Sequence, residues 1–227
     1  MGVDLVRFAP SSHPLARRKR IIESLHIDTV IDVGANVGQF ALQMRREVGF
    51  QGRILSFEPL TSAYRVLSGR ADKDTHWKTY PFALGDRNES RAINVAENSG
   101  SSSFLQMLPA HLHSAPESAY VDSETIEIRT LDSLFQAEVP QPGNLFLKID
   151  TQGFERRVLA GAEGSLPRIA TVQLEMSLIP LYSEESLFID LLAFMQARGY
   201  TLIAIENGFT DPATGQLLQV DGIFHRF

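Results

Sequence analysis

The sequence VIDVGANVGQF, residues 30–40, decides the fold. An apolar run that contains Asp32 leads into a turn of small residues, 34–38, after which the spacing of apolar residues becomes helical. This order predicts a buried strand, a glycine turn and a helix. Such a turn lets a ligand approach the backbone, and the helix start offers unpaired N–H groups. Asn36 suits the turn because asparagine tolerates a left-handed backbone better than most residues.

Strand and helix patterns alternate along most of the chain. Strands are expected at residues 29–33, 53–59, 76–85, 145–150, 170–176, 200–206 and 217–227. Helices are expected at about 14–26, 39–47, 62–70, 154–160 and 184–197. Because strands that alternate with helices form βαβ units, the sequence predicts a parallel sheet with right-handed crossovers.

The last two expected strands have no helix between them. The segment that joins them, NGFTDPATGQ (207–216), contains Asn-Gly, Asp-Pro and Thr-Gly turn signals. We therefore expect these two strands to be antiparallel. The predicted fold class is α/β, an open and mostly parallel sheet with helices on both faces and a C-terminal antiparallel strand pair.

The length of 227 residues suits one domain with a sizeable core. Residues 1–28 are expected to form an N-terminal leader with a helix, in which the basic run 17–20 is a solvated helix end. Residues 29–227 are expected to form a single domain. An insertion at about 88–129 interrupts it, with expected strands at 91–97 and 124–130.

Composition excludes several classes of function. The net charge is −6 and the chain has no long basic stripe, so nucleic acid is not expected as the main partner. There is no cysteine, which excludes disulfides and thiolate metal sites. No apolar run approaches the ~20 residues of a membrane span, so we expect a cytoplasmic protein.

The acid at the end of the second strand indicates a cofactor. Glu58 lies 20 residues after Gly38, and an acid at that place commonly bonds a pair of ribose hydroxyls. Together with the turn it predicts an adenosine-like group. The dinucleotide pattern G-x-G-x-x-G is not matched, and Asp32 before the turn suits a sulfonium better than a pyrophosphate. These features favour S-adenosylmethionine over a nicotinamide cofactor.

Two other classes of function remain open at this point. One is a nicotinamide-dependent reductase, although none of the five Tyr residues is followed four positions later by Lys, as a short-chain reductase requires. The other is a non-catalytic module that binds adenosyl compounds. An activity assay separates this module from an enzyme.

Five motifs resemble those of one family. They occur in the order DVGANVG (32–38), FEP (57–59), TLDSL (130–134), KIDTQGFE (148–155) and QLEMS (173–177). Together they resemble the FkbM-type S-adenosylmethionine-dependent methyltransferases, which have the class I Rossmann-like fold. The resemblance runs from about residue 29 to the C-terminus. It implies an O-methyltransferase that acts on a hydroxyl of a sugar, glycolipid or polyketide-type small molecule.

The resemblance also implies which residues bind the cofactor. Glu58 matches the acid that holds the ribose hydroxyls, and Asp86 is expected near the adenine amino group. Ala83 and Leu84 are expected beside the adenine ring. The residues that match the first motif, on the methionine side of the cofactor, are Asp32, Gly34, Ala35, Asn36 and Gly38.

Three residues near strand ends are candidates for catalysis. Asp150 ends the fourth strand and is the leading candidate for the base that removes the hydroxyl proton, besides a role at the cofactor. Lys148 lies on the same strand face two residues earlier, and Glu175 ends the fifth strand. Asp150 as a plain helix N-cap is the structural alternative. No metal is expected, although Asp221 also lies near a strand end.

The loop at 98–120 leaves several interpretations open. His111 and His113 are either solvated or able to supply a base over a closed site. The run NSGSSS (98–103) either closes over the cofactor or serves as a linker. The identity of the acceptor and the oligomeric state cannot be predicted from these segments.

Overall fold

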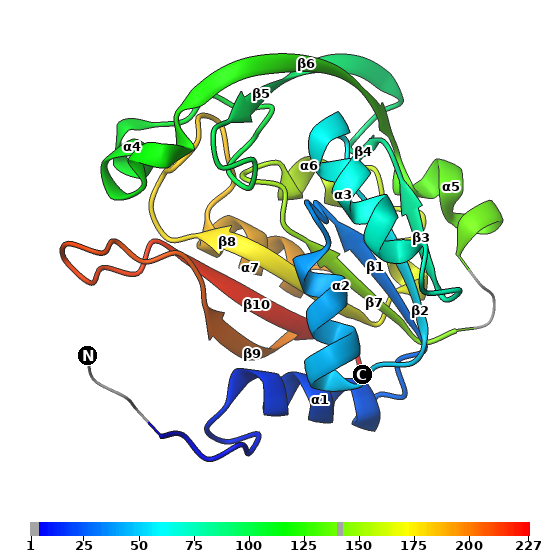
Figure 1. The fold of residues 1–227 in the computed structure, drawn as a ribbon. Helices are drawn as coiled ribbons and strands as arrows, with labels where there is room; N and C mark the ends of the chain where they lie inside the picture. Colours follow the sequence, from blue (N-terminus) through cyan, green and yellow to red (C-terminus); the bar gives the residue numbers. More distant parts are fainter. Residues whose placement is uncertain (1–4, 140–142) are drawn as a thin grey trace.

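Figure 1 shows the computed structural model of the chain, which describes residues 5–139 and 143–227. A seven-stranded sheet forms its centre, in the order β3-β2-β1-β7-β8-β10-β9. Of the predicted leader, residues 1–4 lie outside the described residues. The strands of this sheet are β1 (Thr29–Val33), β2 (Arg53–Phe57), β3 (Trp77–Tyr80), β7 (Leu145–Ile149), β8 (Thr171–Ser177), β9 (Thr201–Asn207) and β10 (Gln219–His225).

The predicted sheet is confirmed. Strand β1 pairs in parallel with β2 and β7, and β2–β3 and β7–β8 are parallel as well. Strand β10 is inserted between β8 and β9 and runs antiparallel to both. The reversed strand is therefore the last one, as the turn signals before it predict.

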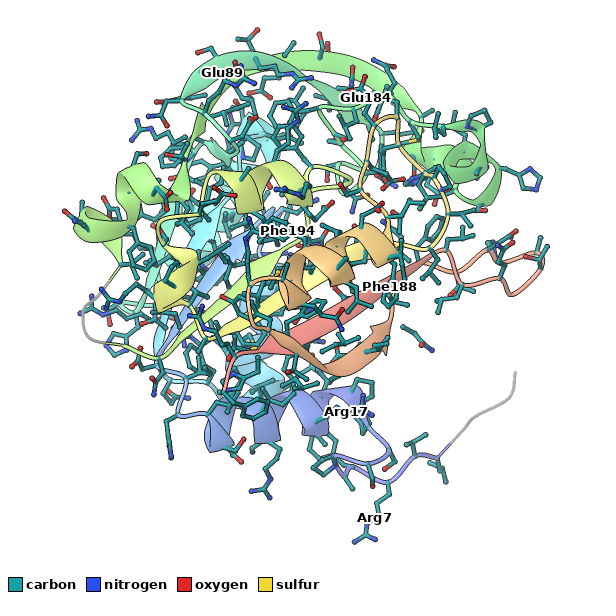
Figure 2. The ribbon with its side chains drawn as sticks, turned by 180° about the vertical axis from the view of Figure 1, so that it is seen from behind. Arg7, Arg17, Glu89, Glu184, Phe188 and Phe194 are labelled. Atoms are coloured by element: carbon teal, nitrogen blue, oxygen red, sulfur yellow. The ribbon has the colours of Figure 1, made fainter. Side chains whose placement is uncertain are left out.

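Helices cover both faces of the sheet. In Figure 1, α2 (Gln39–Gln43) lies in front of the sheet and α1 (Pro14–Ser24) runs along its lower edge. Helix α2 continues as a π-helical turn over Met44–Val48. Figure 2 shows the opposite face, which α7 (Phe188–Gln196) covers with Phe194. The other helices are α3 (Thr61–Ala71), α5 (Leu131–Glu138) and α6 (Glu155–Ala160).

Two apolar clusters fill the space between the helices and the sheet. Alternate residues of the central strands point to opposite faces, so Ile31 joins the cluster beneath α5, α6 and α7, while Val30 joins the cluster beneath α1 and α2. Ile22 of α1 belongs to this second cluster and is 5% exposed. The helix of the predicted leader therefore packs on the sheet.

A second, three-stranded sheet arches over the carboxyl ends of the central strands (Figure 1). It consists of β4 (Ala83–Leu84), β5 (Glu89–Ala96) and β6 (Tyr120–Arg129), in the order β4-β6-β5. The short helix α4 (Pro109–Ser114) lies between β5 and β6 in the chain. The segment predicted as an insertion thus forms a twisted ribbon above the main sheet.

Two predicted boundaries were wrong, and one helix was not predicted. The strand expected at 76–85 is two strands in different sheets, because Pro81 has no N–H for a ladder hydrogen bond. Helix α7 begins at Phe188 instead of 184, after Glu184 adopts a left-handed backbone with φ 60°. Helix α5 was not predicted, although Thr130 caps it by accepting a hydrogen bond from the Ser133 N–H at 3.2 Å.

Within the described residues, no helix combines the length and the apolar character that crossing a membrane requires.

Candidate functional site

A cavity of about 380 Å³ opens at the carboxyl ends of β1, β2 and β7, beneath the arch of the second sheet. The lining from the second sheet and β2 is mainly apolar, and the lining from α1, β8 and β10, on the other side of β1 and β7, is polar. Of the residues predicted from the sequence, those that line the cavity are Gly34, Ala35, Asn36, Glu58, Ala83, Leu84, Lys148 and Asp150. Ligands of open α/β sheets bind at this edge.

The glycine turn forms one wall of the cavity. Gly34 has φ 75°, and a Cβ at this position would lie 1.8 Å from the backbone oxygen of Asp150. Asn36 has φ 47°, and its side-chain Oδ1 accepts a hydrogen bond from the Val37 N–H at 2.7 Å. At position 34 the turn therefore has no room for a Cβ, and at position 36 an asparagine that bonds locally adopts the left-handed backbone. Gly38 packs against Leu67 and does not line the cavity.

Glu58 is presented to the cavity by the end of β2. Its Oε2 accepts the Asn36 N–H at 2.8 Å, and its Oε1 accepts the Leu60 N–H at 2.9 Å. The residue is 5% exposed, and this burial raises the pKa of its carboxyl to about 7. Each oxygen keeps further acceptor capacity, which a pair of ligand hydroxyls can use.

Asp32 does not line the cavity, because its side chain is fully buried beside Lys148, its partner in the sheet register. Its Oδ2 accepts a hydrogen bond from Ser56 Oγ at 3.3 Å, and its Oδ1 lies 3.4 Å from Lys148 Nζ. Burial raises the pKa of the Asp32 carboxyl. The acid that the sequence predicts at the ligand therefore lies beneath it and holds Lys148.

Lys148 links two carboxylates. Its Nζ lies 3.2 Å from Asp150 Oδ2, in addition to the contact with Asp32. Burial acts to lower the pKa of Lys148, but the neighbouring Asp150 and Asp32 outweigh it and raise that pKa above its ordinary value. The ammonium group consequently stays charged at neutral pH.

Gln152 positions the other oxygen of Asp150. Its Nε2 donates to Asp150 Oδ1 at 3.0 Å and to Glu175 Oε2 at 2.8 Å, while its Oε1 accepts from the Tyr182 hydroxyl at 2.7 Å. Burial, followed by the charge of Asp150, raises the pKa of Glu175 well above its ordinary value. Glu175 does not line the cavity and contacts Asp150 only through Gln152.

Glu155 has a structural role. It is buried, and its Oε1 accepts the N–H groups of Thr151 at 2.7 Å and of Gly153 at 3.3 Å. Burial raises the pKa of this carboxyl to about 7. These bonds hold the turn that follows Asp150 in place.

The apolar end of the cavity contains the residues expected beside an adenine ring. Besides Ala83 and Leu84, its lining includes Leu60, Ile93, Phe104 and Phe154. Asp86 does not line the cavity, because its Oδ2 is engaged by Arg157 at 3.0 Å and by Arg87 at 3.4 Å. The two arginine contacts hold Asp86 outside the cavity lining.

The serine-rich run 98–103 lies across the cavity. Ser99, Gly100 and Ser102 line it, and Asn36 Nδ2 donates to Ser99 Oγ at 3.3 Å. Ser103 Oγ donates to the backbone oxygen of Gln152 at 2.7 Å. Of the two interpretations of this run, the structure favours closure over the ligand site.

The histidines lie elsewhere. His111 is 3% exposed and packs against the rings of Tyr182 and Phe209, with centroids 5.1 and 5.2 Å away. Burial lowers its pKa. It does not line the cavity, and His113 does not line it either.

The polar end of the cavity is lined by Arg18, Gln43, Gln173 and Asp221. Of these, only Asp221 was singled out from the sequence, as an acid near a strand end. Gln173 alternates with Thr171 and Glu175 along its strand, a signal that the sequence offered, whereas Arg18 is hidden in a basic run that resembles a solvated helix end. Among the described residues, no three or more acidic or histidine side chains are grouped as ligands for a metal ion.

Comparison with known proteins gives the following findings. Residues 32–202 match the family model described as the methyltransferase FkbM domain. The fold is similar to that of an FkbM methyltransferase from Methylobacillus flagellatus KT, with a TM-score of 0.54 and 13% identity over 86% of this chain and 43% of that one. An rRNA methylase from Streptococcus thermophilus gives a TM-score of 0.51 and 10% identity, over 95% and 97% of the chains.

At such identities the two solved structures show the fold alone. The chain spans less than half the length of the Methylobacillus protein. No curated protein matches the sequence.

Proposed function

Because the chain belongs to the FkbM methyltransferase domain family, we propose that it transfers a methyl group from S-adenosylmethionine to a hydroxyl of a sugar, glycolipid or polyketide-type small molecule. The observation that carries this proposal is Glu58, a buried carboxylate on the cavity wall beside a turn that requires glycine at position 34. A cofactor with a ribose fits this pairing of acid and turn.

The cavity suits the two ends of such a cofactor. Glu58 would accept hydrogen bonds from the ribose hydroxyls, and the apolar end with Ala83 and Leu84 would hold the adenine. The amino-acid end of the methionine part carries an ammonium and a carboxylate, and Lys148 and Asp150 offer a cation and an anion side by side, 3.2 Å apart. The bound cofactor would supply an activated methyl group.

The three catalytic candidates differ in the roles that they can take. We assign the base to Asp150, because it lines the cavity and each of its oxygens keeps acceptor capacity beside its bonds to Lys148 and Gln152. Lys148 serves as a fixed positive charge, since its raised pKa keeps it protonated. Glu175 is a positioning residue that acts on Asp150 through Gln152.

The experiment that tests this function is a calorimetric titration of the purified protein with S-adenosylhomocysteine, with NADH and NADPH as controls. We expect micromolar binding of S-adenosylhomocysteine alone. Binding of a nicotinamide cofactor alone would favour the reductase instead. A protein that binds S-adenosylhomocysteine but methylates no sugar or polyketide hydroxyl would support the non-catalytic module.

A further inference from the structure

The cavity has a polar end that the adenosine part of a cofactor does not explain. Arg18 of α1, Gln173 of β8 and Asp221 of β10 line it, together with Phe40 and Gln43 at α2. These side chains come from four elements that are distant in the sequence. They meet because Gln173 and Asp221 lie on the sheet face that α1 and α2 cover.

This end contains buried polar groups without partners. Gln173 is 2% exposed, and its Oε1 has no hydrogen bond from the described residues. Arg18 is 5% exposed. Its Nη1 donates to Gln43 Oε1 at 2.7 Å and its Nη2 is paired with Glu206, while Nε lacks a partner among the described residues. Both unpaired atoms are themselves buried, while other atoms of the two side chains line the cavity. Because unpaired buried polar atoms cost free energy, a ligand that draws these side chains into hydrogen bonds would remove that cost.

Asp221 is held less firmly than the other carboxylates that line the cavity. Glu58 accepts two backbone N–H groups, and Asp150 is bonded by Lys148 and Gln152. The hydrogen-bond donor beside the Asp221 carboxylate is the Gln173 amide. Within the described ranges, 5–139 and 143–227, no Lys or Arg nitrogen lies within 4 Å of this carboxylate. Because a carboxylate can accept about four hydrogen bonds, Asp221 keeps the capacity to accept one from a ligand hydroxyl.

The charges at this end argue against a charged ligand. Arg18 is paired with Glu206, and Lys148 with Asp32 and Asp150, so an anionic ligand finds no unpaired cation among these residues. The negative charge of Asp221 would be balanced by the sulfonium of a cofactor bound in the same cavity. An uncharged molecule whose hydroxyls both donate and accept matches an amide, a carboxylate and a guanidinium.

We propose that Arg18, Gln173 and Asp221 form the acceptor subsite, and that it selects an uncharged, polyhydroxylated molecule over charged analogues of the same shape. This inference rests on the proposed function. The ring of Phe40, with Arg18 Cζ 5.2 Å and Lys148 Nζ 5.5 Å from its centroid, supplies an apolar wall for the C–H face of such a molecule.

Three matched probes test the selectivity: methyl glucopyranoside, the corresponding glucuronic acid derivative and the corresponding 2-amino sugar. Each is titrated calorimetrically into protein that is saturated with sinefungin, a cofactor analogue whose amine carries the positive charge of the sulfonium. We expect the neutral glycoside to bind at millimolar concentration, and each charged analogue to bind at least roughly 10-fold more weakly, the equivalent of one lost hydrogen bond. Equal or tighter binding of a charged analogue would overturn the proposal, as would no binding of any probe.

Two variants test the residues. Asp221→Asn keeps the shape of the side chain and Gln173→Met keeps its length. If one of the two variants fails to fold, the other still tests the proposal. Each should weaken binding of the glycoside roughly 10-fold, while Asp72→Asn on the exposed surface should not. Unchanged glycoside binding in both folded variants would overturn the assignment. Wild-type protein that binds neither S-adenosylhomocysteine nor sinefungin would overturn the proposed function, a result distinct from failure of the glycoside titration alone.

Discussion

The Glu58 carboxylate accepts the backbone N–H of Asn36 at 2.8 Å, which ties the end of β2 to the turn after β1. The same carboxylate accepts the Leu60 N–H at 2.9 Å, so its two oxygens are held by backbone groups from two segments of the chain. The acid therefore has a fixed orientation before any ligand binds. Preorganisation of this kind lowers the entropic cost of binding.

Replacement of Glu58 by Ala should weaken the binding of S-adenosylhomocysteine by about 1–3 kcal/mol, because the ribose hydroxyls would lose their acceptor. The measurement is calorimetric titration at neutral pH. Glu23→Ala, on the exposed surface of α1, is the control and should bind as the wild type does. Wild-type affinity in the Glu58→Ala variant would remove the ribose role from this residue.

Glu58 strengthens ligand binding in the prediction above, but its burial is expected to lower the stability of the ligand-free protein at high pH. Its carboxyl pKa rises from 4.5 to about 7 on folding, so between these values the folded state holds a proton that the unfolded chain releases. The free energy of unfolding therefore falls as pH rises through this window. Removal of this ionisation in Glu58→Gln should add up to about 3 kcal/mol to the stability at pH 8, the upper bound set by this shift. The Gln amide nitrogen cannot accept the second backbone N–H, and that lost hydrogen bond lowers the stability equally at every pH.

Urea unfolding of Glu58→Gln and wild type at pH 5 and pH 8 measures this effect. The gain should be smaller at pH 5, where the wild-type carboxyl is protonated in the folded state. Glu155 also has a pKa raised to about 7, but it is present in both proteins and cancels in the comparison. A gain of equal size at both pH values would contradict the link to ionisation.

The parts of the fold that follow from local pattern were predictable. Strand β1, its glycine turn and the reversed strand β10 are set by apolar runs and turn residues close in sequence. The division of residues 76–85 between two sheets was not, because the pairing of β4 with β6 joins segments more than 40 residues apart. The periodicity of one segment does not tell which of two sheets it joins.

Some residues of the candidate site could likewise be predicted from local sequence, and others could not. Asn36 and Glu58 adjoin a recognisable turn and strand end, so their positions on the cavity wall could be expected. Arg18 and Gln173 could not, because they meet only after α1 packs on the sheet. The orientation of Asp32 also escaped prediction, since it depends on which face of β1 the helices α1 and α2 cover.

Gly34→Ala should destabilise the protein by several kcal/mol, on the order of the strain of a left-handed backbone plus a steric clash. The added Cβ would lie 1.8 Å from the Asp150 backbone oxygen, at a φ of 75°. Gly69→Ala in α3, where no atom lies within 4 Å of the added Cβ, is the matched control. It should stabilise by about 0.5–1 kcal/mol, because alanine favours a helix over glycine.

Urea unfolding of both glycine variants measures the difference. Wild-type stability in Gly34→Ala would show that the turn relaxes without loss, and the requirement for glycine at the cavity wall would then be refuted.

Asp150→Asn should separate catalysis from cofactor binding. The amide keeps the shape of the side chain but accepts no proton, so the rate of methyl transfer should fall by about 10²–10⁴, the usual contribution of a general base. The affinity for S-adenosylhomocysteine should change less than the rate, because Glu58 and the glycine turn are unaltered. Single-turnover transfer from labelled S-adenosylmethionine, paired with calorimetry, gives both quantities on the same preparation.

The contacts of Lys148 and Glu175 provide controls for the Asp150→Asn experiment. Lys148 would lose one of its two carboxylate partners in Asp150→Asn but keep Asp32 at 3.4 Å, so the ammonium remains paired and the fold should persist. Glu175→Gln is the companion variant, since it alters only the contact that reaches Asp150 through Gln152. Its rate should fall less than that of Asp150→Asn. Equal losses in the two variants would mean that the position of Asp150, and not its basicity, limits the transfer.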